Sequence, residues 1–314
     1  MVNGNGGIAL LFAGQGAQYI GMGKDLYEAF PESKAVFDKA DEALGFNLKH
    51  HCFAGSADML KMTHICQPAV LTVSIASFEA FKSVAGFKLQ AASFSAGLSL
   101  GEYSALVASG VLHFEDAVKL VRKRAELMNE SALRHPGKMA AIIGLDKEEI
   151  KKICLVSGKC DIANFNCPSQ VVISGVKEAV DKAKDVALQK GAKQAVDLEV
   201  SGAFHSSLMW DAAMEFKSIL EERIRFDEPK IPVVSNVDAK PEYRIAQITE
   251  NLVKQIYSPV LWEDSMKFIL SKGIMDFFEF GPGRVLKGLM RRIDEKAQVI
   301  AIENKEDILE GGRE

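Results

Sequence analysis

Short apolar runs alternate with helical patterns along the first part of the chain, and this alternation restricts the fold more than any other feature. The apolar runs at 7–14 and 91–95 predict strands. Residues 25–44, with an interruption at Pro31, residues 67–83 and the segment after Ser99 predict helices. Strands that alternate with helices form parallel sheets, because each helix returns the chain to the edge where the previous strand began. We therefore expect an α/β fold with a mostly parallel sheet.

The middle of the chain has a different order of elements. Between residues 132 and 202 the pattern is strand, helix, strand, strand, helix, strand, which is the ferredoxin-like βαββαβ order. The alternation of helices and strands then resumes, with a strand expected at 231–238. We expect a large α/β subdomain from residues 1–131 and 203–314, and a small ferredoxin-like α+β subdomain from residues 132–202. A cleft between them is a natural place for a ligand.

Composition excludes several classes of protein. The 38 basic and 42 acidic residues give a net charge of −4, which argues against general nucleic-acid binding. The five cysteines include no Cys-x-x-Cys pair, so we expect reduced thiols and no metal site. The first basic residue is Lys24, and the apolar run at 8–13 is too short for a signal peptide. The sequence predicts a cytoplasmic protein that does not bind membranes.

A serine stands between two glycines in the stretch Gly97-Leu98-Ser99-Leu100-Gly101. This pattern, after a predicted strand and before a predicted helix, is typical of a nucleophile elbow, a sharp turn that exposes a reactive serine. Small residues also line ordinary strand-to-helix turns, so the motif alone leaves both interpretations open. A reactive serine further requires a base, because its hydroxyl is otherwise a poor nucleophile.

Six histidines are candidates for that base: His50, His51, His64, His113, His135 and His205. His205 lies in VSGAFHSSLMWD, where the chain would re-enter the large subdomain and face the expected cleft. By position alone, a histidine with a structural role is a comparable alternative.

The glycine-rich stretch FAGQGAQYIGMGKD follows the first predicted strand and invites comparison with phosphate-binding loops. The dinucleotide pattern requires a glycine where Tyr19 stands, and the P-loop requires glycine at Gln18 and serine or threonine at Asp25. Both patterns fail. Glycines beside a strand end instead suit an oxyanion hole, which needs accessible backbone N–H groups.

Three basic residues follow one another closely in the predicted helix that contains VRKRAELMN. Arg122 and Arg124 point about 200° apart at the α-helical repeat, so one of them can face inward while the other faces solvent. A buried arginine would most plausibly bind a carboxylate, because its two-pronged guanidinium matches the two oxygens.

Ordered blocks along nearly the whole chain resemble the malonyl-CoA:acyl carrier protein transacylase family. They include GQGAQ at 14–18, QPA at 67–69, SLGEYSALVASGV at 99–111, DAVKLVRKRAELM at 116–128, FHSSLM at 204–209, VVSNVD at 233–238 and FGPGRVLKGL at 280–289. The resemblance implies an α/β-hydrolase-like large subdomain and a ferredoxin-like small one, in agreement with the order of predicted elements.

The resemblance also implies roles for individual residues. Ser99 would be the acylated nucleophile, His205 its base, and the backbone carbonyl of Gln255 the group that orients the histidine. Arg124 would bind the malonyl carboxylate. No catalytic aspartate is then required.

Further roles follow from the same resemblance. The backbone N–H groups of Gln15 and Leu100 would form the oxyanion hole, and Phe204 would select against branched acyl groups. One departure is Leu98, which stands where the family usually has histidine. Because that histidine is not the base, we expect activity to survive.

The implied reaction transfers a malonyl group from malonyl-CoA to the phosphopantetheine thiol of an acyl carrier protein, and so supplies fatty acid synthesis. It proceeds by a ping-pong Ser-His mechanism through a malonyl-serine, and needs no cofactor. The partners are an acyl carrier protein and a coenzyme A thioester, and basic residues are expected to attract the acidic carrier: Lys190, Lys193, Lys287, Arg291 and Arg292. A serine esterase and a non-catalytic docking module remain the alternatives.

Overall fold

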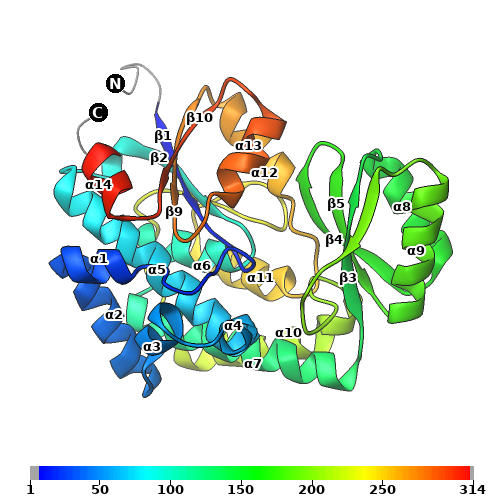
Figure 1. Ribbon diagram of the computed structural model, residues 1–314, viewed down its shortest axis with the longest axis horizontal. Helices are drawn as coiled ribbons and strands as arrows, with labels where there is room; N and C mark the ends of the chain where they lie inside the picture. The colour runs from blue at the N-terminus through cyan, green and yellow to red at the C-terminus, as the bar shows by residue number, and fades with distance from the viewer. Residues whose placement is uncertain (1–6, 312–314) are drawn as a thin grey trace.

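The computed structural model describes residues 7–311 and contains two separate sheets (Figure 1). The larger sheet has the strand order β10-β9-β1-β2-β7-β8. Its strands are β1 (Ile8–Phe12), β2 (Ala92–Gly97), β7 (Val233–Val234), β8 (Pro241–Glu242), β9 (Asp276–Phe280) and β10 (Gln298–Ile302). All pairs are parallel except β7 with β8. The prediction of an α/β fold with a mostly parallel sheet is confirmed.

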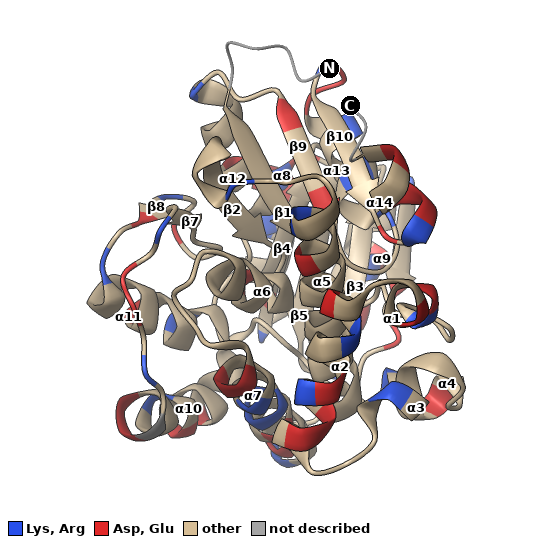
Figure 2. Cartoon of the chain, turned by 90° about the vertical axis from the view of Figure 1, so that its left-hand side faces the viewer, with Lys and Arg blue, Asp and Glu red and all other residues tan. Residues whose placement is uncertain are grey.

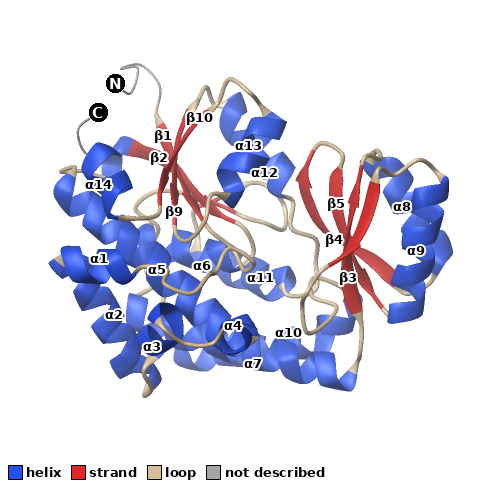
Figure 3. Ribbon diagram, in the orientation of Figure 1, coloured by secondary structure: helices blue, strands red, loops and turns tan. Residues whose placement is uncertain are grey.

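The smaller sheet is antiparallel and has the order β4-β5-β3-β6 (Figure 3). Its elements follow one another as β3 (Lys138–Ile143), α8 (Lys147–Ser157), β4 (Cys160–Cys167), β5 (Gln170–Gly175), α9 (Lys177–Gln189) and β6 (Gln194–Asp197). Successive strand residues face opposite sides. Ala140 and Ile142 therefore join the core under α8 and α9, whereas Met139 and Ala141 join the core of the larger unit.

The larger sheet is surrounded by helices. They are α1 (Lys24–Ala29), α2 (Pro31–Leu44), α3 (Leu48–Phe53), α4 (Ala57–Lys61), α5 (Thr63–Val84), α6 (Leu100–Ala108), α7 (Phe114–Arg134), α10 (Trp210–Arg223), α11 (Ile245–Gln255), α12 (Trp262–Ser271), α13 (Val285–Ile293) and α14 (Lys305–Gly311). The helix pattern predicted at 25–44 divides at Phe30, whose extended backbone precedes Pro31. Figure 2 shows charged residues on outer helices such as α2, α7 and α10.

Helix α5 is buried along almost its whole length, between α2 and α7 on one side and the sheet on the other. It has no charged residue before Glu79, and a helix that is apolar all round belongs in a core. No helix within residues 7–311 combines the length and the apolar character that a membrane crossing requires.

The strand predicted at 231–238 is much shorter than expected. Only Val233 and Val234 pair with neighbouring strands. Beyond them the chain leaves the parallel direction, because the Ser235 N–H donates to the Lys240 carbonyl at 2.9 Å. Ala239, with φ at 55°, completes the reversal into β8. The prediction of an eight-residue strand is wrong, because a turn takes up its second half.

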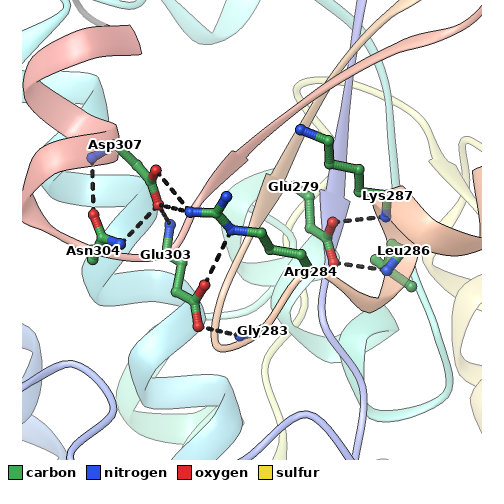
Figure 4. A network of polar contacts seen from close by, with 8 residues as sticks. All are labelled: Glu279, Gly283, Arg284, Leu286, Lys287, Glu303, Asn304 and Asp307. Carbon is green, nitrogen blue, oxygen red and sulfur yellow. Dashed lines mark hydrogen bonds and ion pairs between the residues drawn. The ribbon is translucent and has the colours of Figure 1, made fainter.

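The N-terminus of α13 is held by a buried carboxylate (Figure 4). Both oxygens of Glu279, at 1% exposure, accept backbone N–H groups, from Leu286 and from Lys287, each at 2.8 Å. A carboxylate stabilises a helix N-terminus because the first N–H groups have no partner within the helix. Beside it, Arg284 donates to Glu303 and Asp307. Since α12 and α13 both contact β4, this anchor fixes an element that lies between the two sheets (Figure 1).

Glu242 on β8 is a second buried carboxyl. Its side chain is fully buried, and Oε1 accepts a hydrogen bond from Asn251 Nδ2 at 2.8 Å. Burial, and then the nearby Glu102, raise the pKa of Glu242 to about 9. Burial also raises the pKa of Glu102 and that of Glu279 to about 7. Of these three carboxyls, Glu242 keeps its proton to the highest pH, so it contributes most to titration of the folded protein as the pH approaches 9.

We expect the free energy of unfolding to fall as the pH rises from 7 to 9, and Glu242→Gln to flatten this decline. Above pH 7 the unfolded chain has lost the Glu242 proton but the folded protein keeps it, so raising the pH favours unfolding. The change should exceed about 1 kcal/mol, since one pKa unit corresponds to about 1.4 kcal/mol. Denaturant titrations at both pH values measure it, with the exposed Glu250→Gln as control. Equal declines in parent and Glu242→Gln would contradict the assignment.

Candidate active site

Ser99 stands at a sharp turn between strand β2 and helix α6. Its φ of 52° lies in the left-handed region, which is strained for a residue with a side chain. The flanking glycines are required by packing: a Cβ at Gly97 would lie 2.0 Å from the Gly101 carbonyl, and one at Gly101 would lie 2.2 Å from the Phe12 oxygen. The strand, turn and helix lie where the sequence predicts them.

The hydroxyl of Ser99 contacts His205. Ser99 Oγ lies 2.7 Å from His205 Nε2, and His205 Nδ1 lies 2.7 Å from the backbone oxygen of Gln255. A carbonyl only accepts, so Nδ1 carries the proton and Nε2 is free to accept the serine proton. Of the six histidines, the structure thus brings His205 to the serine. No carboxylate is needed to fix this tautomer.

His205 is held in an unusual state by its surroundings. Its side chain is 5% exposed, and its φ of 57° is also left-handed. Burial, and then the positive charge of Arg124, lower the pKa of His205 to about 4. The imidazole is therefore neutral, and able to act as a base, across the range from weakly acidic to alkaline pH.

Arg124 points into the protein and Arg122 points outward, as the helical repeat allows. Arg124 is 1% exposed, and its guanidinium donates to Gln67 Oε1 at 2.8 Å, to Gln255 Oε1 at 2.9 Å and to Ser99 Oγ at 3.2 Å. All three acceptors are neutral. Burial lowers the pKa of Arg124. A buried guanidinium held only by neutral groups is suited to receive a carboxylate from a ligand.

Two further backbone positions lie beside the serine. Leu100 is the first residue of α6, so its N–H belongs to the helix-terminal donors that have no acceptor within the helix. Gln15 follows Gly14, where a Cβ would lie 2.4 Å from the Leu98 oxygen. This close approach brings the loop after β1 against the serine turn. The Gln15 side chain is tied to α5, because its Oε1 accepts from Thr63 Oγ1 at 3.1 Å.

These groups open onto one cavity of about 200 Å³. Ser99, His205, Arg124, Gln15, Leu98 and Phe204 all line it, together with Val285 and Leu289 of α13 and residues of the smaller sheet: Met139, Asn164, Asn166, Gln170 and Val172. The cavity thus has walls from both sheets, which is where the sequence predicts a ligand site.

Sequence reasoning missed three polar residues around the serine: Gln67, Glu102 and Asn236. Each lies within a block that resembles the family, namely QPA, SLGEYSALVASGV and VVSNVD. A side chain that bonds a group far along the chain leaves no periodic signal, so only their fully buried positions in the fold reveal them.

The five basic residues expected to attract an acidic partner are distributed over two helices and their flanks. Lys190, after α9, pairs with Glu149 at 2.6 Å, which neutralises its charge. Arg292, on α13, donates to Gln170 of the cavity wall. A basic patch at the mouth of the cavity stays a prediction. Among residues 7–311, no cluster of three His, Cys, Asp or Glu side chains is arranged to hold a metal ion.

An α/β fold that presents a serine to a histidine at a strand-to-helix turn defines a class of acyl-transferring enzymes, and the comparisons place the chain within it. The acyl transferase domain family matches residues 9–297. The malonyl CoA-acyl carrier protein transacylase of Bacillus subtilis is 46% identical over 305 residues, 96% of this chain and 95% of that protein. The Staphylococcus aureus (strain MRSA252) protein of the same name is 40% identical, with 96% of both chains covered.

Solved structures give the same result. The acyl-carrier-protein-S-malonyltransferase of Bartonella henselae superposes with a TM-score of 0.94 at 40% identity, covering 98% of both chains. A malonyl-transacylase in complex with its type II PKS acyl-carrier protein also has a TM-score of 0.94 and 40% identity, covering 98% of this chain and 99% of that one. The chain belongs to the malonyl CoA-acyl carrier protein transacylase family and is an acyltransferase, as its sequence blocks indicate.

Proposed function

We propose that this enzyme transfers a malonyl group from malonyl-CoA to the phosphopantetheine thiol of an acyl carrier protein, by a ping-pong mechanism through a malonyl-serine. The observation that carries the proposal is that Ser99 Oγ lies within hydrogen-bond distance of both His205 Nε2 and a buried arginine. The names of the relatives, and the complex of one relative with an acyl-carrier protein, support the choice of substrates.

In the first half-reaction Ser99 Oγ attacks the thioester carbonyl while its proton passes to His205 Nε2. A C–O bond forms, and the negative oxygen of the tetrahedral intermediate is stabilised by the backbone N–H groups of Gln15 and Leu100. Collapse of the intermediate breaks the C–S bond. The sulfur of coenzyme A leaves with the proton from His205, and malonyl remains on the serine.

In the second half-reaction the carrier thiol enters the same cavity. His205 takes the thiol proton, the sulfur attacks the malonyl carbonyl, and the C–O bond to Ser99 breaks as the proton returns to Oγ. The carbonyl of Gln255 holds the histidine in the required tautomer throughout. Each step uses groups of this chain alone, so the reaction needs no cofactor.

Selectivity comes from the groups around the acyl chain. The malonyl carboxylate would pair with Arg124, which otherwise has neutral partners. Phe204, buried and on the cavity wall, would crowd a branch beside the carbonyl. Leu98 also lies on the wall, at the position where the family usually has histidine. Its apolar side chain cannot make a hydrogen bond there. Since it donates no proton in either half-reaction, activity survives its presence.

The architecture and setting of the reaction belong to the same proposal. We infer that the six-stranded unit is α/β-hydrolase-like, and that residues 132–202 form a ferredoxin-like subdomain, since its strand order and βαββαβ succession agree with that fold. We also infer that the enzyme works in the cytoplasm and supplies fatty acid synthesis.

Intact-mass spectrometry after brief exposure to malonyl-CoA tests the proposal. The parent should gain one malonyl group, lose it when a phosphopantetheinylated carrier is added, and release little malonate to water without the carrier. Ser99→Ala should gain none. Rapid release of malonate to water would favour the esterase alternative, and absence of any adduct would favour a docking module.

We expect kcat/KM for malonyl transfer to stay nearly constant from pH 8 down to about pH 5. His205 is the base, its pKa in the free enzyme is about 4, and kcat/KM reports the groups of the free enzyme. Activity should therefore fall only when the pH approaches 4, and brief assays followed by return to pH 7 will separate this loss from unfolding. A decline centred near pH 6.5 would contradict the low pKa of the base.

A further inference from the structure

The strained turn at Ser99 is clamped by the side chain of Asn236. Asn236 Oδ1 accepts the Ser99 N–H at 2.7 Å, and Asn236 Nδ2 donates to the Gly97 carbonyl at 2.8 Å. One amide group thus bridges the two ends of the turn across Leu98. These two bonds fix the assignment of Oδ1 and Nδ2, because an N–H can only donate and a carbonyl can only accept. Asn236 itself is fully buried.

Glu102, the single charged residue of α6, lies behind the same turn. Its Oε2 accepts the Asn236 backbone N–H at 3.2 Å and the Gln255 Nε2 group at 2.7 Å. Gln255 Nε2 also donates to the Ser99 carbonyl at 3.0 Å, while Gln255 Oε1 accepts from Arg124. The carboxylate therefore sets the orientation of an amide that contacts both the serine backbone and the arginine.

Gln255 therefore contacts all three of the residues proposed to act together. Its backbone oxygen holds His205, its side-chain oxygen holds Arg124, and its side-chain nitrogen holds the backbone of Ser99. If the side-chain amide were reversed, its nitrogen would face the guanidinium donor, and its oxygen would face the Ser99 carbonyl. Glu102 opposes that reversal, because its oxygen needs a donor.

We propose that Asn236 and Glu102 are positioning residues, which hold the turn of Ser99 and the amide of Gln255 in the geometry that lets Ser99, His205 and Arg124 act together. The inference rests on the proposed function, since it concerns the same serine. Neither residue lines the cavity. They act through the groups that do line it, so they are not catalytic residues.

The surroundings of the second oxygen of Glu102 indicate whether its positioning role needs a negative charge or only a hydrogen-bond acceptor. Oε1 is buried and has no hydrogen-bond partner among the described residues. A proton on Oε1 would leave Oε2 free to accept both of its bonds. The charged groups around Glu102 are Arg124 on α7, Asp238 in the turn after β7, and Glu242 on β8. The role of Glu102 thus depends on one accepting oxygen rather than on its charge.

The variant Asn236→Asp tests the clamp, because the same protein can be measured with the new carboxyl group charged and with it protonated. Above its pKa the new carboxylate places an oxygen against the Gly97 carbonyl, and two acceptors repel. Burial beside Glu102 and Glu242 raises that pKa, and the protonated carboxyl can again donate to Gly97. We expect acylation of Ser99 to be about 100-fold slower than in the parent at pH 8, and to recover to within about tenfold at pH 5.5.

Three further variants and a control complete the experiment. Asn236→Ala should lose a similar factor at both pH values. Glu102→Gln should stay within about threefold of the parent, because its Oε1 accepts both bonds, whereas Glu102→Leu should lose about 100-fold. Ser33→Ala is the control for stability: Ser33 Oγ makes a buried bond to Ala76 at 2.9 Å, away from the cavity. It should lower the unfolding midpoint without slowing acylation.

Two readouts separate this inference from the proposed function. Acylation by malonyl-CoA depends on the proposed function and on the positioning of Ser99. Labelling by a fluorophosphonate reports the reactivity of Ser99 without a malonyl group. A parent that reacts with the fluorophosphonate but not with malonyl-CoA would overturn the proposed function alone. A variant Asn236→Asp with the same pH dependence as the parent in both readouts, or Glu102→Leu as active as Ser33→Ala, would overturn the positioning roles.

Discussion

We expect His205→Ala to lower the rate of malonyl transfer to the carrier by about 10⁴-fold or more, because the proposed mechanism then lacks the base of its serine nucleophile. The proton of Ser99 then has no acceptor at 2.7 Å, and the leaving sulfur has no donor. Both half-reactions are affected, so single-turnover acylation should fall as steeply as steady-state transfer.

A matched control for this variant is His135→Ala, at the end of α7, where His135 pairs with Asp211 on the surface. That variant should transfer malonyl groups at the parent rate. Residual activity of His205→Ala above a tenth of the parent rate would show that another group accepts the serine proton.

We expect Arg124→Ala to change the preference between acyl groups rather than to abolish transfer. Without the guanidinium, malonyl-CoA loses a charge-assisted hydrogen bond of about 1.5–3 kcal/mol, which is about 10- to 150-fold, while acetyl-CoA loses nothing comparable. The ratio of kcat/KM for malonyl-CoA to that for acetyl-CoA should therefore fall by about that factor.

Arg122→Ala is the control for Arg124→Ala, because it removes the same charge two residues earlier on the same helix. Arg122 is half-buried at the surface and bonds Glu126 and the Leu44 carbonyl, so its loss should leave the ratio unchanged. An unchanged ratio in Arg124→Ala as well would remove the arginine from the recognition of the carboxylate.

The sequence predicts the long elements of the fold well and the short ones poorly. Strand β1 is apolar and buried on both faces, and helices such as α7 have a clear periodicity, so their patterns are strong. Helices α3 and α4 have six and five residues, too few for a periodic pattern. Their remaining signals were the capping residues Asn47 and Ser56.

The residues of the candidate site likewise include some that the sequence predicts directly and others that it does not. A nucleophile elbow has a local sequence pattern because its glycines are forced by packing, so Ser99 could be found directly. The contribution of Gln255 comes partly from a backbone carbonyl, which every residue type has, and only the family resemblance pointed to it. Asn236 bonds the serine turn from 137 positions along the chain, a relation that exists only after folding.

The cavity has walls from two units, so the polar groups around the serine and the wall that faces them belong to different sheets. Ser99 and Arg124 are carried by helices of the six-stranded unit, whereas Met139, Asn164 and Val172 belong to the four-stranded sheet opposite. Under the proposed function, substitutions on that opposite wall would change the room for longer or bulkier acyl groups while Ser99, His205 and Arg124 keep their positions. We therefore expect that the range of accepted extender units can be altered, by engineering or by natural selection, through substitutions in the four-stranded sheet alone.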